Sequence, residues 1–225
     1  MATSAVVELA RLEGWPDDEV VRRVLAGEIE MFEIIMRRYN SRLFRVALSI
    51  VRNEAEAEDI VQDAYVRAYV HLDQFEARAQ FSTWLTRIAV HEALARAKRR
   101  NRQEPLEEED SPGTLMTRMR SPEQSASDKE LKMLIESAIL TLPAKYCTVL
   151  IMRDVQEMDT AETAACLGIS EENVKVRLHR ARAILRRELY ARAGGNLTRA
   201  FGFDGDRCDR MVAGVFRRLN EIVRR

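Results

Sequence analysis

The stretch that decides the fold of this chain is TAETAACLGISEENVKVRLHRAR, residues 160–182. Its first part, 160–167, predicts a short helix whose inward-facing residues are Thr163, Ala164 and Leu167. Gly168 follows where the chain must turn, because glycine adopts a positive φ at little cost. Ser170 is a suitable N-cap for a second helix that begins one residue later. The stretch therefore predicts a helix-turn-helix.

The second helix of this motif carries a cluster of basic side chains: Lys175, Arg177, His179, Arg180 and Arg182. A helix of this width fits the major groove of B-DNA, where the base edges can be told apart. The same pattern also fits a two-helix corner in an all-α protein whose basic residues only face solvent. The remainder of the chain has to decide between these two interpretations.

The composition limits the class of protein. The chain has 225 residues with 36 basic and 36 acidic side chains, so any contact with DNA depends on local clusters of charge. A content of 46% hydrophobic and 32% charged residues is typical of a globular protein. Glycine and proline are scarce, which favours helices over a sheet with many turns.

Catalytic, metal and membrane signals are missing from the sequence. Cys147, Cys166 and Cys208 form no CxxC pair, so we expect buried thiols in a reducing cytoplasm and no metal site. No nucleophile triad or phosphate-binding glycine loop is present, so neither an enzyme nor a cofactor is expected. The start of the chain does not resemble a signal peptide, and no apolar run reaches the roughly 20 residues that span a bilayer. We therefore expect a cytoplasmic protein without membrane insertion.

Helical periodicity without strand-like alternation predicts an all-α fold. Helices are expected over 17–26, 28–51, 55–72 and 82–100, the last capped by Ser82, and again from 128 to 192 with breaks near 143, 154–159 and 168. Residues 101–127 are rich in proline and charge and predict a flexible linker. The predicted organisation is an N-terminal segment (1–16), a helical domain (17–100), the linker (101–127), a second helical domain (128–192) and a C-terminal extension (193–225). An apolar stripe over 206–225 predicts an amphipathic helix in that extension.

Three blocks of sequence, taken in order, resemble one protein family. They are AEAEDIVQDAYVRAY at 55–69, FSTWLTRIAVHEALARAKRR at 81–100 and the segment from LPAKYC to RREL at 142–189. Together they resemble the bacterial RNA polymerase sigma factors of the extracytoplasmic-function (ECF) type, over roughly residues 17–190. The resemblance implies a non-enzymatic factor that binds core RNA polymerase and directs promoter recognition and transcription initiation. It also implies an anti-sigma protein as a candidate partner.

The acidic block over 54–63 contains five carboxylates and no basic residue. From charge alone it would be a solvated helix face. The resemblance implies instead that this helix docks on the β′ clamp helices of the polymerase, with the β flap as a second contact of the factor. The candidate core-polymerase contacts are Asp59, Ile60, Gln62, Asp63 and Tyr65.

The block over 81–100 has an apolar face, Phe81, Trp84, Leu85, Ile88 and Leu94, and a basic one. The resemblance implies that this helix and the loop before it, 73–80, read the −10 element and hold a flipped base. The candidate −10 residues are Arg78, Trp84, Arg87, His91, Arg96, Lys98 and Arg99, although packing in the core is the favoured role of Trp84. Many relatives carry asparagine at the position of His91, so the −10 preference is expected to differ.

The helix-turn-helix matches the part of the family that reads the −35 element of promoter DNA. By alignment Lys175, Val176 and His179 approach base edges, while Arg177, Arg180 and Arg182 hold phosphates. Two alternatives stay open on the sequence. One is a conventional helix-turn-helix regulator that binds an operator as a dimer, and the other is a helical protein-interaction module that uses the C-terminal stripe.

Overall fold

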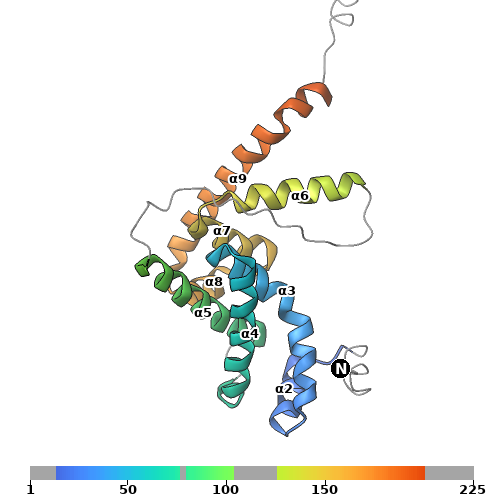
Figure 1. Ribbon diagram of the computed structural model, residues 1–225, viewed down its shortest axis with the longest axis vertical. Coiled ribbons are helices and arrows are strands. Elements are labelled where there is room, and N and C mark those ends of the chain that lie inside the picture. Colours follow the sequence, from blue (N-terminus) through green and yellow to red (C-terminus); the bar gives the residue numbers. More distant parts are fainter. Residues whose placement is uncertain (1–13, 77–79, 104–125, 201–225) are drawn as a thin grey trace, which may run out of the picture. The chain divides into compact units, whose positions relative to one another are not determined.

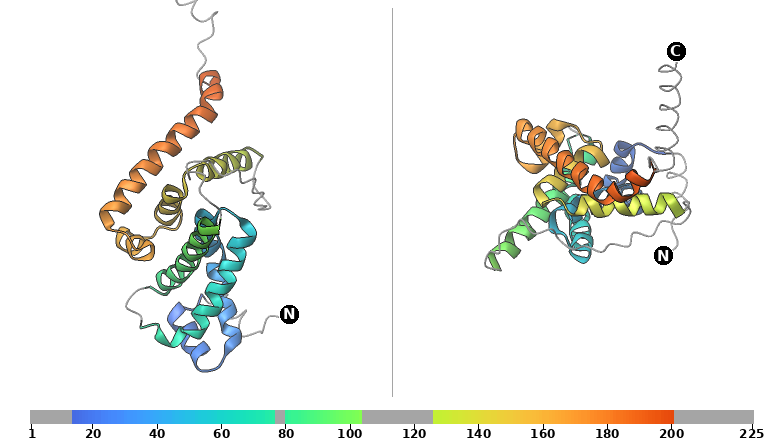
Figure 2. Two further views of the ribbon diagram at one scale, coloured as in Figure 1. Left: turned by 60° about the vertical axis from the view of Figure 1, so that its left-hand side comes forward. Right: turned by 90° about the horizontal axis from the view of Figure 1, so that it is seen from above.

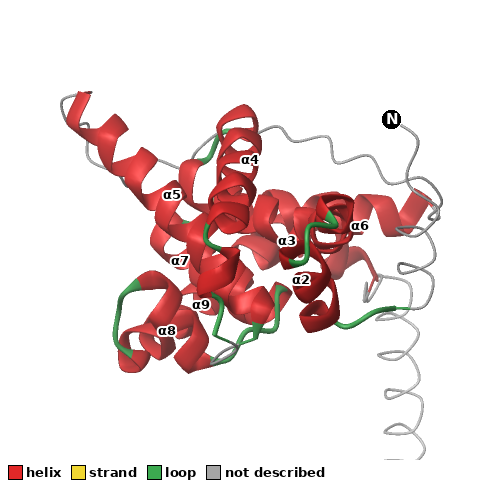
Figure 3. Ribbon diagram, turned by 90° about the horizontal axis from the view of Figure 1, so that it is seen from below, coloured by secondary structure: helices red, strands yellow, loops and turns green. Residues whose placement is uncertain are grey.

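The computed structural model describes residues 14–76, 80–103 and 126–200, and over these residues every regular element is a helix (Figures 1 and 3). The α-helices are α2 (Asp17–Leu25), α3 (Phe32–Val51), α4 (Glu54–Val70), α5 (Phe81–Gln103), α6 (Ala126–Leu140), α7 (Ala144–Leu150), α8 (Thr160–Leu167) and α9 (Glu171–Ala200). Short 3₁₀ turns occupy Ile29–Met31 and Leu72–Gln74, and a π-helical turn occupies Ile151–Val155. The predicted all-α fold is confirmed for these residues. The linker between α5 and α6 and the predicted helix at 206–225 lie outside them.

Helices α3, α4 and α5 pack against one another in the first domain, and Figure 2 shows them side by side. A set of apolar residues recurs at helical spacing along α4, and its members are all buried: Ile60, Ala64, Tyr65, Ala68 and, in the turn that follows, Leu72. Burial of such apolar side chains is the main favourable contribution to folding. The 3.6-residue period therefore identified the inner side of this helix.

The break between α3 and α4 depends on two adjacent residues. Arg52 ends α3 in the left-handed conformation, with φ of 59°. Asn53 is extended, and its side chain accepts a hydrogen bond from the amide of Glu56 at 2.9 Å. An asparagine N-cap satisfies an amide that has no partner within the helix. The predicted separation of the helices over 28–51 and 55–72 is thereby confirmed.

Three predictions for the first domain are corrected. Residues 28–51 are not one helix, because a 3₁₀ turn precedes α3. Ser82 is not the N-cap of α5, since the helix already includes Phe81 and the carbonyl of Gln80 accepts from the amides of Thr83 and Trp84. Leu94 is 40% exposed and does not belong to the apolar face of α5. The inward line of this helix is formed by Leu85, Ala89, Val90 and Ala93.

The predicted helix-turn-helix is confirmed as α8 and α9. Gly168 ends α8 with φ of 64°, and Ser170 Oγ accepts from the amide of Asn173 at 3.2 Å. A capping box precedes the motif. The Asp159 side chain accepts from the amide of Glu162 at 2.7 Å, and the Glu162 side chain accepts from the amide of Asp159 at 2.9 Å. The tetrapeptide DTAE at 159–162 is the sequence signature of this box.

The two helical domains contact each other within one compact unit that extends to Leu185; a second unit begins at Arg186. The hydroxyl of Ser49 on α3 donates to Thr148 Oγ1 on α7 at 3.1 Å, and both residues are buried. The guanidinium of Arg52 donates to the carbonyl oxygens of Leu140 and Leu142.

A second contact between the domains joins α5 to α8. The two helices pack together, and Thr83 Oγ1 donates to Glu162 Oε1. Glu162, the second member of the capping box of α8, therefore also accepts a hydrogen bond from the first domain.

Candidate nucleic-acid and protein interfaces

Helix α9 buries one side and exposes the other. Val174, Leu178 and Ala181 are buried, as expected for residues about one turn apart. Among the predicted −35 residues, those most distant from this buried line are Val176, which is 42% exposed, His179 and Arg180. Three of the predicted −35 residues therefore share the outward side of the helix.

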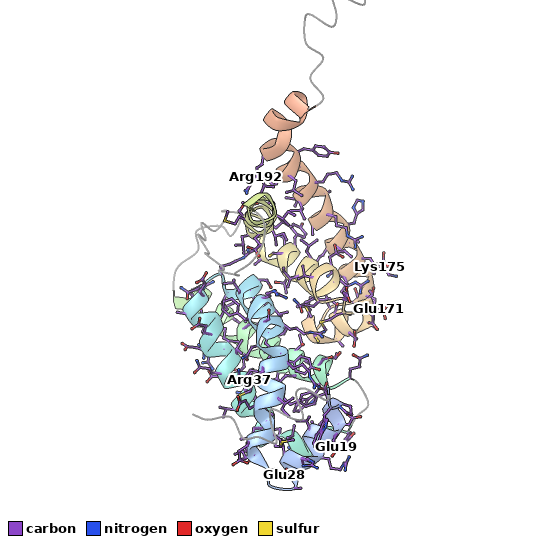
Figure 4. All side chains as sticks on the ribbon, turned by 90° about the vertical axis from the view of Figure 1, so that its right-hand side faces the viewer. Glu19, Glu28, Arg37, Glu171, Lys175 and Arg192 are labelled. Carbon is purple, nitrogen blue, oxygen red and sulfur yellow. The ribbon has the colours of Figure 1, made fainter. Side chains whose placement is uncertain are left out.

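The remaining predicted −35 residues flank that side. Lys175 is exposed, with Nζ 4.0 Å from Glu172 Oε2, and Figure 4 shows it with Glu171 near the start of α9. Arg177 Nε donates to Asn173 Oδ1 at 2.9 Å on the opposite flank. Arg182 differs from the others because its guanidinium makes two hydrogen bonds to the carboxylate of Asp154.

The exposed face of α4 combines carboxylates with apolar side chains. Asp59, Gln62 and Asp63 are exposed, and the same side of the helix continues with Val66 and Val70, which are 65% and 64% exposed. Exposed branched apolar residues beside acidic ones are typical of a protein-binding surface. The sequence analysis missed the two valines, although they follow Gln62 and Asp63 at helical spacing.

Two predicted polymerase contacts lie inside the first domain. Ile60 is fully buried, and Tyr65 is 6% exposed and donates its hydroxyl to the carbonyl of Met36 at 3.1 Å. The ring of Tyr65 also meets Phe32 edge-on, with centroids 6.1 Å apart. In this structure both side chains belong to the core, behind the exposed face of α4. Their spacing within the apolar period of α4 is the sequence signal for this inward position.

Ion pairs line the contact between α4 and α5. Arg67 Nη1 lies 2.6 Å from Glu92 Oε1, and Arg100 Nη1 lies 3.2 Å from Glu56 Oε2. Between them, Arg96 pairs with Asp63 and lies 3.9 Å from Asp59. Residues later in α4 pair with residues earlier in α5, so the two helices are antiparallel along this contact. Beside them is an open groove of about 350 Å³, lined by Asp63, Val66, Arg67, Val70, His71 and Glu92.

The predicted −10 residues that the structure describes fall into two groups, those with exposed side chains and those engaged in contacts within the protein. Arg87, His91, Lys98 and Arg99 are exposed along α5, whereas Arg96 is engaged with the carboxylates of α4. Trp84 is half-buried in an aromatic cluster, with its ring 5.5 Å from those of Phe75 and Phe81. Arg78 lies outside the described residues.

The described cysteines are buried. Burial raises the pKa of the Cys166 thiol to about 11 and also raises the pKa of Cys147. Desolvation disfavours the thiolate, which is the reactive form. Within residues 14–76, 80–103 and 126–200, no cluster of three His, Cys, Asp or Glu side chains could hold a metal ion. No helix in the same ranges is both long and apolar enough to cross a bilayer.

Family models match both domains. Sigma-70 region 2 matches residues 35–103, and sigma-70 region 4 matches residues 132–185. The chain thus combines a first domain of the region 2 class with a second domain of the region 4 class, as transcription initiation factors of the sigma-70 type do.

Similar proteins narrow the class. The ECF RNA polymerase sigma factor SigW of Bacillus subtilis is 34% identical over 177 residues, which cover 75% of this chain and 94% of SigW. SigM of Mycobacterium tuberculosis is 30% identical, covering 81% of this chain and 90% of SigM. The sigma-E factor of Escherichia coli is 27% identical, covering 74% and 90%. This chain belongs to the ECF RNA polymerase sigma factors, a non-enzymatic family that directs promoter recognition by RNA polymerase.

Two solved structures share the fold. The complex of the sigma factor RpoE with the anti-sigma factor NepR from Bartonella quintana matches with a TM-score of 0.56 and 24% identity, covering 70% of this chain and 96% of that one. CnrH in complex with the cytosolic domain of CnrY matches with a TM-score of 0.53 and 24% identity, covering 76% and 96%.

Proposed function

We propose that this sigma factor docks on core RNA polymerase through the exposed face of α4, and places α5 at the −10 element and α9 at the −35 element. The observation that carries the proposal is the continuous face formed by Asp59, Gln62, Asp63, Val66 and Val70. Its carboxylates suit a basic partner and its valines supply apolar area that a partner can bury. The β′ clamp helices are the proposed partner of this face, and the β flap is the proposed partner of the second domain.

Promoter DNA is the proposed ligand of the two basic helices. On α9 we assign base contacts to Lys175, Val176 and His179, and phosphate contacts to Arg177 and Arg180. On α5 we assign Arg87, His91, Lys98 and Arg99 to the −10 region. All of these side chains except the partly buried Arg177 are exposed, which supports the assignment. Arg78 keeps its sequence-based assignment to the −10 loop, whereas Trp84 and Arg96 need contacts broken before they reach DNA.

Regulation by an anti-sigma protein in the cytoplasm is the proposed setting. It is supported by the two structural neighbours, one of which is described in complex with an anti-sigma factor. The family context supports the cytoplasmic location.

Docking is tested by size-exclusion co-elution of the full chain with bacterial core RNA polymerase. We expect Asp63→Arg and Val66→Asp to lower the affinity at least about tenfold. The first sets a positive charge against a basic partner, and the second places a charge where the partner covers apolar area. Asp18→Arg is the matched control, since Asp18 is an exposed carboxylate on α2. Wild-type elution of all three variants would place the docking face elsewhere.

DNA recognition is tested by comparing promoter variants with the reconstituted holoenzyme. Lys175→Ala should cost roughly 1–3 kcal/mol at one base step of the −35 element. Arg180→Ala should instead weaken binding to all promoters and flatten the dependence on salt. Identical behaviour of the two variants across promoters would contradict the separation of base and phosphate contacts.

A further inference from the structure

We propose that Arg182 positions the recognition helix α9 through a bidentate pair with Asp154 and holds no DNA phosphate, so that Asp154 determines −35 affinity without touching DNA. The inference rests on the proposed reading of the −35 element by α9. It reverses the role that alignment implies for Arg182 and gives one to Asp154, for which the sequence suggested none.

The pair has the geometry of a fork. Arg182 Nε donates to Asp154 Oδ2 at 2.9 Å, and Arg182 Nη2 donates to Asp154 Oδ1 at 2.6 Å. Two parallel bonds between planar groups fix orientation as well as distance, which a single bond does not. Surface ion pairs contribute little on average, but the bidentate arginine–carboxylate pair is the recognised exception.

The position of Arg182 on the helix agrees with this role. At about 100° per residue, Arg182 lies roughly 160° around α9 from Arg180 and only about 40° from the buried Leu178. Arg182 therefore lies off the outward side formed by Val176, His179 and Arg180, on the flank of Lys175 and about two turns beyond it. Its side chain points instead toward the segment that precedes α8.

Asp154 is itself held firmly. It lies in the π-helical turn Ile151–Val155, where the amide of Gln156 donates to the carbonyl of Ile151 at 2.9 Å. The neighbouring Arg153 donates to the carbonyl of Met158, and the amide of Met158 donates to the carbonyl of Met152 at 3.0 Å. The carboxylate thus projects from a segment with fixed ends, and the fork connects that segment to the third turn of α9.

The two roles of Arg182 predict opposite effects of removing the Asp154 charge. If Arg182 holds a phosphate, Asp154→Asn releases it and removes a negative charge, so binding to DNA becomes tighter. If Arg182 positions α9, the same change loosens the helix and weakens binding although the protein becomes more positive. General electrostatics therefore cannot imitate the expected result.

The experiment uses the full chain and two fluorescently labelled DNA duplexes of equal length. One carries a sequence that the wild-type protein selects from a random pool, and the other carries an unselected sequence. Fluorescence anisotropy gives affinity over a range of salt concentrations. We expect Asp154→Asn and Arg182→Gln each to weaken binding to the enriched duplex by about 3–10-fold, with a wild-type salt slope. Arg182→Lys should not restore binding, because a lysine contacts a phosphate well but cannot make the fork. The exchanged pair Asp154→Arg with Arg182→Asp should restore most of the affinity.

Other results overturn the inference. Three results would each make Arg182 a phosphate contact. They are tighter DNA binding by Asp154→Asn, a salt slope reduced by about 0.9 in Arg182→Gln, and weaker DNA binding by the exchanged pair than by any of the single variants. Circular dichroism melting checks the fold of each variant, and the exchanged pair decides the matter if a single variant unfolds. If neither the wild-type chain nor the holoenzyme that it forms with core polymerase distinguishes the two duplexes, the proposed −35 function fails, and the inference falls with it.

Discussion

At the scale of single residues, Gly168 shows a conformation that the turn of the motif requires. Its φ is 64°, and a Cβ added there would meet no atom within 4 Å. The cost of a side chain is therefore a backbone cost alone. We expect Gly168→Ala to lower the free energy of unfolding by roughly 1–2 kcal/mol and Gly168→Asn by less, because asparagine tolerates the left-handed region. Urea unfolding checks both, and equal losses would show that something other than φ sets the penalty.

Cys166 makes stability depend on pH in the alkaline range. Burial raises its pKa from 9.0 to about 11, so the folded protein keeps a proton that the unfolded chain releases. The contribution is complete below pH 9 and is lost as the pH rises through 11, by ~2–3 kcal/mol in total.

Unfolding in urea at several pH values, for wild type and Cys166→Ala, isolates this effect. Burial also raises the pKa values of Tyr39 and Tyr65. Their contribution to the pH dependence of stability is the same in both proteins and cancels when the two free energies of unfolding are subtracted. The stability difference should be constant near neutral pH and shift in favour of Cys166→Ala above pH 9. A difference that is independent of pH would contradict the buried thiol.

Local sequence rules predicted local features of these residues and failed for distant pairs. Gly168 and Ser170 were predicted because a turn and a cap depend on neighbours in the chain. The partner of Arg182 is 28 residues away and that of Arg96 is 33 residues away, so no periodicity within one helix reveals them. A helical pattern shows which side of a helix is polar. It does not show which charged residue of another helix or loop pairs with the side chains on that side.

At the scale of elements, the α4–α5 contact joins the proposed polymerase surface to the proposed −10 helix. Arg96 pairs with Asp63 and lies near Asp59, so it offsets part of the negative charge of the docking face. We expect Arg96→Gln to strengthen binding to core polymerase, measured without DNA, by up to about 1 kcal/mol, and to do so mainly through faster association at low salt.

Arg99→Gln is the control for Arg96→Gln, because it removes the same charge from an exposed position of the same helix. Equal gains from both variants would reflect net charge alone. Weaker binding by Arg96→Gln would show that the pair orders the face for docking.

Helix bounds were predicted well where caps mark them and less well elsewhere. Residues 160–167 form α8 as expected, since a cap and a glycine enclose them. The π-helical turn at Ile151–Val155 was not predicted, because it uses the same residue types as an ordinary helix. Its wider turn is set by bonds such as that from Arg153 to Met158, which form only in the folded domain.

At the scale of the molecule, the proposed −10 helix α5 and the proposed −35 residues of α9 lie within one compact unit, in which α5 contacts α8. The −10 and −35 elements are about 25 base pairs apart, or roughly 85 Å along B-DNA. We therefore expect the contacts between the domains to separate before the proposed −10 and −35 helices read both elements together. The buried Ser49–Thr148 hydrogen bond, at 3.1 Å, is among those that must break.

A disulfide across this contact tests the requirement. We expect Ser49→Cys with Thr148→Cys, in a Cys147→Ala background, to form a crosslink under oxidising conditions and to abolish initiation from a promoter with both elements. Reduction should restore activity to the level of the Cys147→Ala parent. Full activity of the oxidised protein, with the crosslink verified by mass spectrometry, would show that the domains initiate transcription without separating.

The capping box and the Asp154–Arg182 fork also set limits on transplanting this promoter reader into another sigma factor. A graft that begins at Thr160 would import Arg182 without its carboxylate and α8 without its cap, Asp159. A graft that begins before Ile151 carries the π-helical turn, the cap and the recognition helix as one cassette. Chimeras with altered −35 specificity should therefore be joined in the loop at Pro143, upstream of α7, and not at the boundary of the helix-turn-helix itself.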